Sequence, residues 1–424
     1  MNLKLSFRSR ISPNHLQLIG VLLMLGPFGW TSHSIAEISL KNVIDSAYEQ
    51  QQINAQVVHE ENISIARIKH ARSFPNPRVF WEEERLSGNN FGDSKETKIG
   101  ISTSLDFLWN RVSQIEAAEL RQEVALYDIE LKRVGIAEQV VQSLMRMCIE
   151  KKRLDSLERV NRYLDDFYQA VSASIEAGAV PSTSLKMVEI TQDRYRSLML
   201  ESKLSLKNAH IAITHQTGSS DWNIESLEIT DSGFPFLDVE SAVAYAKSHH
   251  PEIRKAKSQL EWLRAESRSA NRKKLPKASL DVGGLQNESG QDGSYIGLSV
   301  DLPFFAKTGS LAEIAKVEAE KVETELKRIA LIFESAVKQV YRAWQVHSER
   351  WENRPSEAKY EELVENSSNL FLAGEYTLLE HLGTIESYYQ GIDSILNRES
   401  KFLESTIRLA TETGAEIPLI IIEQ

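Results

Sequence analysis

The segment YIGLSVDLPFF, residues 295–305, alternates apolar and polar side chains in a chain whose other segments are mostly helical in pattern. Such a period of two is typical of a strand with one apolar and one polar face. The apolar positions are Ile296, Leu298, Val300, Leu302 and Phe304, and the positions between them include Gly297, Ser299 and Asp301. The segment therefore predicts a strand whose apolar face needs a partner other than water.

The same pattern occurs about 197 residues earlier, in KIGISTSLDFL (98–108), where Ile99, Ile101, Leu105 and Phe107 share the apolar face. Each copy follows a second candidate strand that lies after a proline, in FPNPRVFW (74–81) and LPKASLDVGGL (275–285). The stretches between the paired strands are rich in Gly, Asn, Asp and Ser, which favours turns. We therefore predict two β-hairpins, at 78–107 and 278–304.

The similarity extends beyond the hairpins and indicates a tandem duplication. Each half reads as a helix, a hairpin, a very long helix, a tight Ala-Gly turn and a return helix. A long helix of this length extends on the order of 100 Å and must pack lengthwise against neighbours. In the second half, Pro355 should interrupt the long helix, and Ser356 can cap the helical segment after the break. The predicted parts are a first repeat (37–218, with long helix 110–177 and return helix 182–217), a linker (219–238), a second repeat (239–414, with long helix 310–373 and return helix 378–413) and a tail (415–424).

Residues 1–36 are predicted to be a signal peptide, because a basic start precedes an apolar stretch and Ser34-Ile35-Ala36 supplies small residues at a cleavage site. The formal net charge of −11 argues against nucleic acid as a partner. The only cysteine, Cys148, lies in a helical segment, where a buried structural thiol is expected. No catalytic or cofactor motif is present, and His249-His250 has no spaced partner for a metal site, so we expect no enzyme activity, cofactor or metal.

The four predicted strands have the length that a tilted strand needs to cross a bilayer. After residue 36 no apolar run is long enough for a spanning helix, so any span must consist of strands. Four strands cannot close a barrel, and open edges in lipid are costly, so several chains would have to associate. Two chains would supply eight strands for a barrel, and three would supply twelve. Of these two barrels, only the twelve-stranded one leaves room for a lumen. The alternative is a soluble pair of hairpins packed on helices.

Taken together, these features resemble the TolC-like outer-membrane channels of Gram-negative efflux pumps and type I secretion systems. The resemblance rests on the duplicated plan, the proline before each hairpin and the glycine turn after each long helix. The junctions SLDFLWNRVSQIEAAE (104–119) and DLPFFAKTGSLAEIAKVEAE (301–320) are most similar to those of the outer-membrane components of heavy-metal (cobalt, zinc, cadmium) efflux systems. The fold class implied is mainly α with transmembrane β: long helical coiled-coil hairpins that form a helical barrel, plus four strands per chain in a twelve-stranded barrel of a homotrimer.

The resemblance also implies a function and partners. Family members are passive outer-membrane ducts that extend into the periplasm and are engaged by a periplasmic adaptor protein and an inner-membrane pump, here of the resistance-nodulation-division type. Heavy-metal cations would be the substrates, with outer-membrane lipid around the strands and no nucleic acid. Protein secretion or drug efflux through the same fold is one alternative. A soluble periplasmic coiled-coil adaptor is another, and the two alternating hairpins count against it.

Site residues follow from the same resemblance. Gly178 and Gly374 would lie at the periplasmic tip, where the adaptor docks, together with Leu382. Glu380 would contribute to a constricting ring of carboxylates, and Ser184 occupies the corresponding position of the first repeat, after Pro181. A plain helix–turn–helix predicts the same glycines, and a solvated helix glutamate predicts the same Glu380. The strand residues expected to face lipid are Ile99, Ile101, Leu105, Phe107, Ile296, Leu298, Val300 and Leu302.

Overall fold

The computed structural model describes most of the chain after the predicted signal peptide. The described residues are 39–86, 94–178, 180–220, 222, 224–229, 233–301 and 308–423. The predicted signal peptide, 1–36, lies outside them. All described residues belong to one compact unit, Ile38–Gln424, so the two halves of the duplication pack together rather than forming separate domains.

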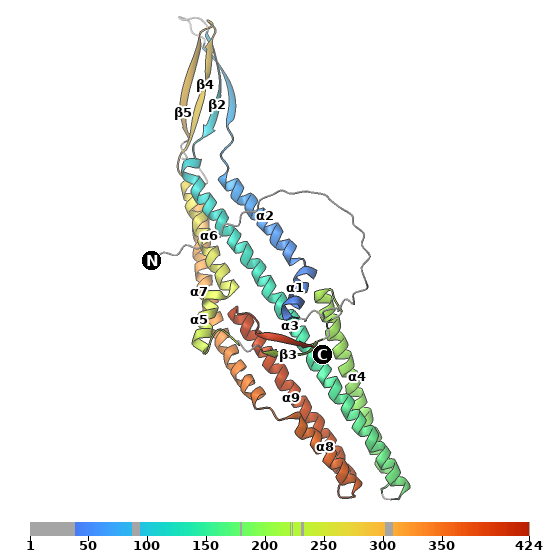
Figure 1. Cartoon of the computed structure of the whole chain (residues 1–424). Coiled ribbons are helices and arrows are strands. Elements are labelled where there is room, and N and C mark those ends of the chain that lie inside the picture. Colours follow the sequence, from blue (N-terminus) through green and yellow to red (C-terminus); the bar gives the residue numbers. More distant parts are fainter. Residues whose placement is uncertain are drawn as a thin grey trace, which may run out of the picture. The chain divides into compact units, whose positions relative to one another are not determined.

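The two hairpins join into one antiparallel sheet. Its strand order is β1-β2-β4-β5, with both hairpins antiparallel and β2 pairing with β4 across the duplication. The sheet lies at one end of the unit (Figure 1). The two outer strands, β1 and β5, each have one edge without a strand partner among the described residues. The strands are β1 (Arg78–Leu86), β2 (Ser94–Ser104), β4 (Lys277–Asn287) and β5 (Asp292–Asp301).

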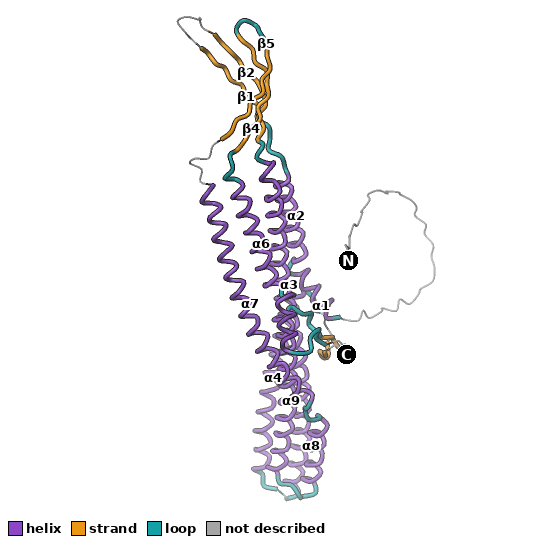
Figure 2. Tube along the Cα trace, turned by 90° about the vertical axis from the view of Figure 1, so that its left-hand side faces the viewer, coloured by secondary structure: helices purple, strands orange, loops and turns teal. Residues whose placement is uncertain are grey.

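The helices continue the order of the strands. Next to the sheet, neighbours pack in the order α2-α3-α6-α7, which is the order of the strands to which they connect, and farther away α4, α9 and α8 extend the same arrangement. Figure 2 shows these helices running side by side away from the strands. The helices are α1 (Leu40–Gln50), α2 (Ile53–Arg72), α3 (Phe107–Glu176), α4 (Thr183–Thr217), α5 (Val239–His249), α6 (Pro251–Arg272), α7 (Thr308–Glu352), α8 (Glu357–Leu372) and α9 (Leu378–Thr413).

The second long helix is broken where Pro355 was expected to interrupt it. α7 ends at Glu352 and α8 begins at Glu357, whereas α3 continues for 70 residues. Proline lacks the N–H that an interior helical position needs and disfavours the helical conformation in the residue before it. Ser356 stands at the N-cap of α8 with extended backbone, but its side chain makes no capping hydrogen bond, contrary to the expectation.

The linker and the tail form a structure that the sequence interpretation missed. β3 (Ile224–Ile229) and β6 (Leu419–Glu423) pair antiparallel in a second, two-stranded sheet. Leu227 and Leu419 are buried in the main core. The segments predicted as a linker (219–238) and a tail (415–424) thus each contain a short strand whose partner is distant in sequence.

The core follows a seam of apolar residues that recur every three or four positions along α3. Its buried seam positions pack against α1, α4 and α9. Two polar side chains of α3 have partners in this packing: Lys152 Nζ donates to the Glu399 carboxylate at 2.6 Å, and the Asn161 side-chain amide donates to Leu157 O at 2.8 Å. The seam positions that are buried are Ile136, Val140, Met147, Leu157, Leu164 and Val171.

Candidate functional site

One face of the four-stranded sheet is apolar and exposed in the single chain. Val79, Ile101, Val282 and Ile296 stand opposite one another across all four strands, and Ile296 is 79% exposed. A parallel row contains Trp81 and Ile99, which are also exposed. Large apolar side chains in a continuous exposed band mark a surface that is covered by something other than water.

The opposite face is polar around a small aromatic cluster. Ser299 Oγ donates to the Asp281 carboxylate at 2.8 Å on this face. The rings of Phe80 and Tyr295, 6.1 Å apart, lie over Gly100. A Cβ on Gly100 would stand 2.7 Å from both Phe80 and the carbonyl oxygen of Val282, so only glycine fits. One apolar and one polar face is the arrangement of a strand in a membrane barrel.

Five of the eight predicted lipid-facing residues lie exposed on these strands, namely Ile99, Ile101, Ile296, Leu298 and Val300. Leu105 lies just past β2, although its N–H still donates to Ala278 O at 2.7 Å. Phe107 is not a strand residue, because α3 begins there and its ring packs edge-on against Phe74 at 5.2 Å. Leu302 lies outside the described residues. The exposed residues of the same face that the predicted lipid-facing set lacks are Val79, Trp81 and Val282.

At the end of the unit opposite the sheet, two turns connect the long helices with their return helices (Figure 1). Gly178 and Gly374 have φ angles of 74° and 75°, the left-handed conformation that ends a helix at little cost only in glycine. After Gly374, the N–H groups of Glu375 and Tyr376 both donate to Leu370 O and satisfy the end of α8. The predicted helix ends are therefore produced by the expected backbone geometry.

Glu380 has a local structural role in the single chain. It forms a capping box with Thr377, whose N–H and hydroxyl each donate to the Glu380 carboxylate at 2.7 Å, while the Glu380 N–H donates to the Thr377 hydroxyl at 3.3 Å. These hydrogen bonds, from the Thr377 backbone first and its side chain second, lower the pKa of Glu380. The carboxylate is thus held charged at the start of α9.

The other predicted tip residues are less accessible. Ser184 is buried, and Leu382 is half-buried against the apolar cluster of Phe167, Val171 and Phe371. In the single chain, Ser184 is therefore part of the packing and is not an exposed counterpart of Glu380.

The sequence interpretation gave no role to His381, which lies in the same cluster. Its side chain is 2% exposed, its ring centroid is 4.2 Å from that of Phe167, and its Nδ1 is 2.8 Å from Ser367 Oγ. Burial lowers the pKa of His381 to about 4. The sequence around His381 could not reveal this environment, because the aromatic rings that contact it, Phe167 and Phe371, belong to two other helices.

Among the described residues, no helix is both long and apolar enough to cross a membrane. The described part of the chain also contains no group of His, Cys, Asp and Glu side chains arranged to hold a metal ion.

Comparison with known proteins gives matches to solved structures only. No protein-family model and no curated protein matches the chain. The structure of CusC matches with a TM-score of 0.70 and 16% identity over 92% of this chain and 95% of that chain. The Campylobacter jejuni CmeC outer membrane channel matches with a TM-score of 0.67 and 16% identity over 95% and 94% of the two chains. The Neisseria gonorrhoeae MtrE outer membrane channel, in its open state, matches with a TM-score of 0.68 and 16% identity over 89% of each chain.

The matches cover the hairpins and the helices together, since they extend over about nine-tenths of each chain. At this level of identity they show the fold alone. The chain has the fold of the TolC-like outer-membrane channels.

Proposed function

We propose that the chain is one protomer of an outer-membrane exit duct that passes solutes from a periplasmic assembly to the outside. The observation that carries the proposal is the four-stranded sheet, with one exposed apolar face, one polar face and two open edges. An open strand edge in lipid leaves backbone groups unpaired at several kcal/mol each. Copies of the chain therefore have to complete the sheet.

Three copies satisfy this requirement and leave a lumen. The β5 edge of one copy would pair with the β1 edge of the next, and three copies of four strands make a twelve-stranded barrel. Because the helices keep the order of the strands, the same closure places α7 and α8 of one copy beside α2 and α4 of the next. Both edges carry exposed apolar side chains suited to such packing: Leu311, Ile314 and Val317 on α7, and Ile190, Leu200, Leu204 and Ile211 on α4.

The partners follow from the duct. A passive conduit needs a periplasmic adaptor and an inner-membrane pump, for which we propose the resistance-nodulation-division type. The turns at Gly178 and Gly374 form the end of the unit farthest from the sheet and are the proposed docking surface. Three charged Glu380 side chains around a threefold axis would repel one another and form the proposed constriction.

The proposal of a duct does not by itself identify the substrate. Heavy-metal cations, the substrate class implied by the sequence resemblance, remain a hypothesis that no described contact favours. A soluble adaptor is disfavoured by the exposed apolar rows of the sheet, since such a protein has no use for them.

The test is fractionation of the full chain in a Gram-negative host, followed by electrophoresis of unheated and heated detergent extracts. We expect recovery in the outer membrane as a trimer-sized species that heating dissociates. Ile296→Arg places a charge on the apolar face and should abolish insertion, while the matched Ser279→Arg change, on the polar face, should be tolerated. A soluble periplasmic monomer, or equal behaviour of the two variants, would refute the proposal.

A further inference from the structure

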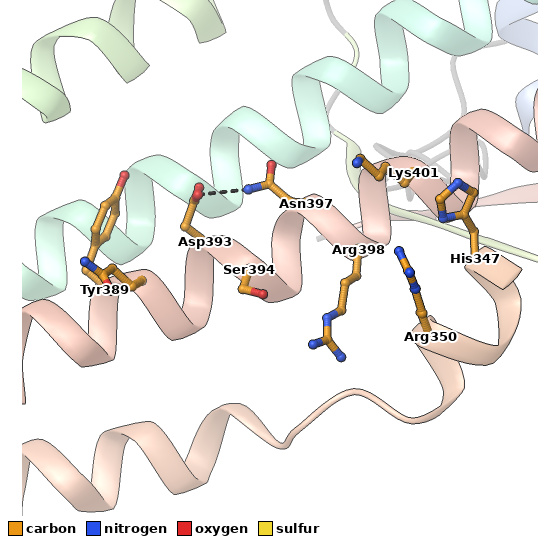
Figure 3. A pocket seen from close by; sticks show the side chains of 9 residues that line it. His347, Arg350, Tyr389, Asp393, Ser394, Asn397, Arg398 and Lys401 are labelled. Atoms are coloured by element: carbon orange, nitrogen blue, oxygen red, sulfur yellow. Dashed lines mark hydrogen bonds between the residues drawn. The ribbon is translucent and has the colours of Figure 1, made fainter.

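A polar cleft lies between the end of α7 and the middle of α9, beside the break that precedes α8. Its volume is about 640 Å³, and its walls include His347 and Arg350 of α7 and Ser394, Arg398 and Lys401 of α9. Figure 3 shows Arg350 reaching from the end of α7 toward α9, with Arg398 and Lys401 nearby. The cleft thus gathers three permanent cations from two helices.

These cations are not neutralised within the described part of the chain, where Arg350, Arg398 and Lys401 take part in no ion pair or hydrogen bond. The only acid in the wall, Asp393, already pairs with Arg153 at 3.0 Å and accepts a hydrogen bond from Asn397 at 2.9 Å. The pKa of His347 is lowered, first by burial and then by Lys401 and Arg350, and Glu404 opposes this shift with a smaller effect, so the cations outweigh the acid at this ring. The cleft is therefore cationic, in a protein whose formal net charge is −11.

The cleft and the β3–β6 sheet lie on opposite faces of the α7–α9 pair. On the sheet's side, Leu227 of β3 lines a separate cleft with Glu399 and Phe402 of α9. Lys401 comes two residues after Glu399, which is about 200° around a helix. Figure 2 shows the small sheet and α1 on the same side of the long helices.

If the helices close into a duct, the position of the β3–β6 sheet on one face of the α7–α9 pair indicates which face lines the inside. The added layer of α1, β3 and β6 would obstruct the duct if it faced inward, so it belongs outside, and the opposite face lines the lumen. Resting on the proposed trimeric duct, we propose that this cleft faces the lumen and that its three copies select anionic solutes, such as those that carry carboxylate, phosphate or sulfonate groups. Nine cations around one level of a water-filled passage raise the local concentration of anions and repel cations.

The positive zone is local along the helices. In the adjoining groove toward the C-terminal end of α9, Glu404 and Glu412 accompany Lys401 and Arg408, so cations and acids balance there. The excess of positive charge is therefore concentrated beside the α7–α8 break. Such a zone works against free metal cations as the substrate and separates this inference from the heavy-metal hypothesis.

The test uses the complete trimeric channel with Ser394→Cys, an exposed position in the cleft wall. The natural thiol, Cys148, is 1% exposed and gives little background. The probes are a sulfonate-bearing and a trimethylammonium-bearing methanethiosulfonate of similar size, applied to channels in planar bilayers and to the protein in detergent. Conductance reports whether the labelled thiol lies in the lumen, and the ratio of the two labelling rates reports the local potential.

We expect the anionic probe to label roughly tenfold faster than the cationic one and labelling to reduce conductance. The ratio should fall toward one when Arg350→Gln, Arg398→Gln and Lys401→Gln are combined. The matched control is Arg354→Gln, because Arg354 lines the cleft on the β3 side, and it should leave the ratio unchanged.

The three ways in which this test can fail are distinguishable. Conducting channels with equal labelling rates, or with a ratio that the triple variant leaves unchanged, would overturn the anionic cleft and leave the duct standing. Conducting channels that labelling does not affect would overturn its lumenal position. Trimers that never conduct would overturn the duct itself.

Discussion

Replacing His381 by glutamine should remove a pH dependence from the end of the unit that carries the two turns. His381 of α9 is buried with Phe167 of α3 on one side and Phe371 of α8 on the other, and Ser367 is its hydrogen-bond partner. The neighbouring carboxylate, Glu380, is held by Thr377 and is exposed to solvent. A proton on the buried imidazole therefore has no acid nearby to stabilise it.

The direction and the size of the pH effect on stability follow from the pKa of His381. In the folded chain it is lowered to about 4 from 6.5, so the unfolded chain binds the proton more tightly. The stabilising contribution is complete above pH 6.5 and is lost as the pH falls toward 4. Between pH 7 and pH 5 the loss is about 2 kcal/mol per protomer, which corresponds to a roughly 20-fold larger open population.

Amide hydrogen exchange measures this local opening. After correction for intrinsic exchange rates, protection of the segment 362–390 should decrease by roughly 20-fold from pH 7 to pH 5 in the natural protein and by much less in His381→Gln. His59→Gln, an exposed histidine on α2, is the control and should keep the full decrease. Equal pH dependence in the natural protein and His381→Gln would refute the assignment to this histidine.

Three further changes test other parts of the structure. Gly374→Ala should lower stability by about 1 kcal/mol in thermal unfolding, because its φ of 75° disfavours any Cβ. Lys152→Met should cost about 3–5 kcal/mol because it leaves Glu399 buried and unpaired, and the additional change Glu399→Leu should recover much of that loss. Gly100→Ala should prevent formation of the heat-sensitive trimer on gels, whereas Gly297→Ala, where the added Cβ meets its nearest atom at 3.6 Å, should allow it.

The long elements were predictable from sequence because each has a strong local signal. The period of two in 98–104 and 295–301 is a strand pattern that the structure reproduces, and the break at Pro355 follows from the missing N–H. The β3–β6 pair was missed because its two short strands lie on either side of the second repeat, far apart in sequence. Local patterns carry no information about such a distant partner.

Site residues were less predictable from sequence, because their surroundings depend on the packing of distant helices and of neighbouring copies of the chain. The exposure of Ile296 and Leu298 follows from alternation, since a strand places such residues on one face. Phe107 also fits the alternation, yet the chain turns into α3 just before it. The cleft of Arg398 and Lys401 could not be inferred, because the nearness of α7 to α9 and the lack of counter-ions are properties of the packing.

The two halves of the duplication differ where they would meet at the axis of a trimer. In the second half, Thr377 and Glu380 form a reciprocal capping box at the start of α9, but in the first half Ser182 makes no side-chain cap and Ser184 is buried. The helix that leads to the first turn is continuous, whereas the one that leads to the second is interrupted after Glu352. A trimer built from this chain would therefore present six helical hairpins of two kinds, of which only the kind that contains α9 carries a capped glutamate, Glu380, after its turn. The Glu380 carboxylates would thus form a ring of three rather than six, because the corresponding position of the first hairpin is the buried Ser184.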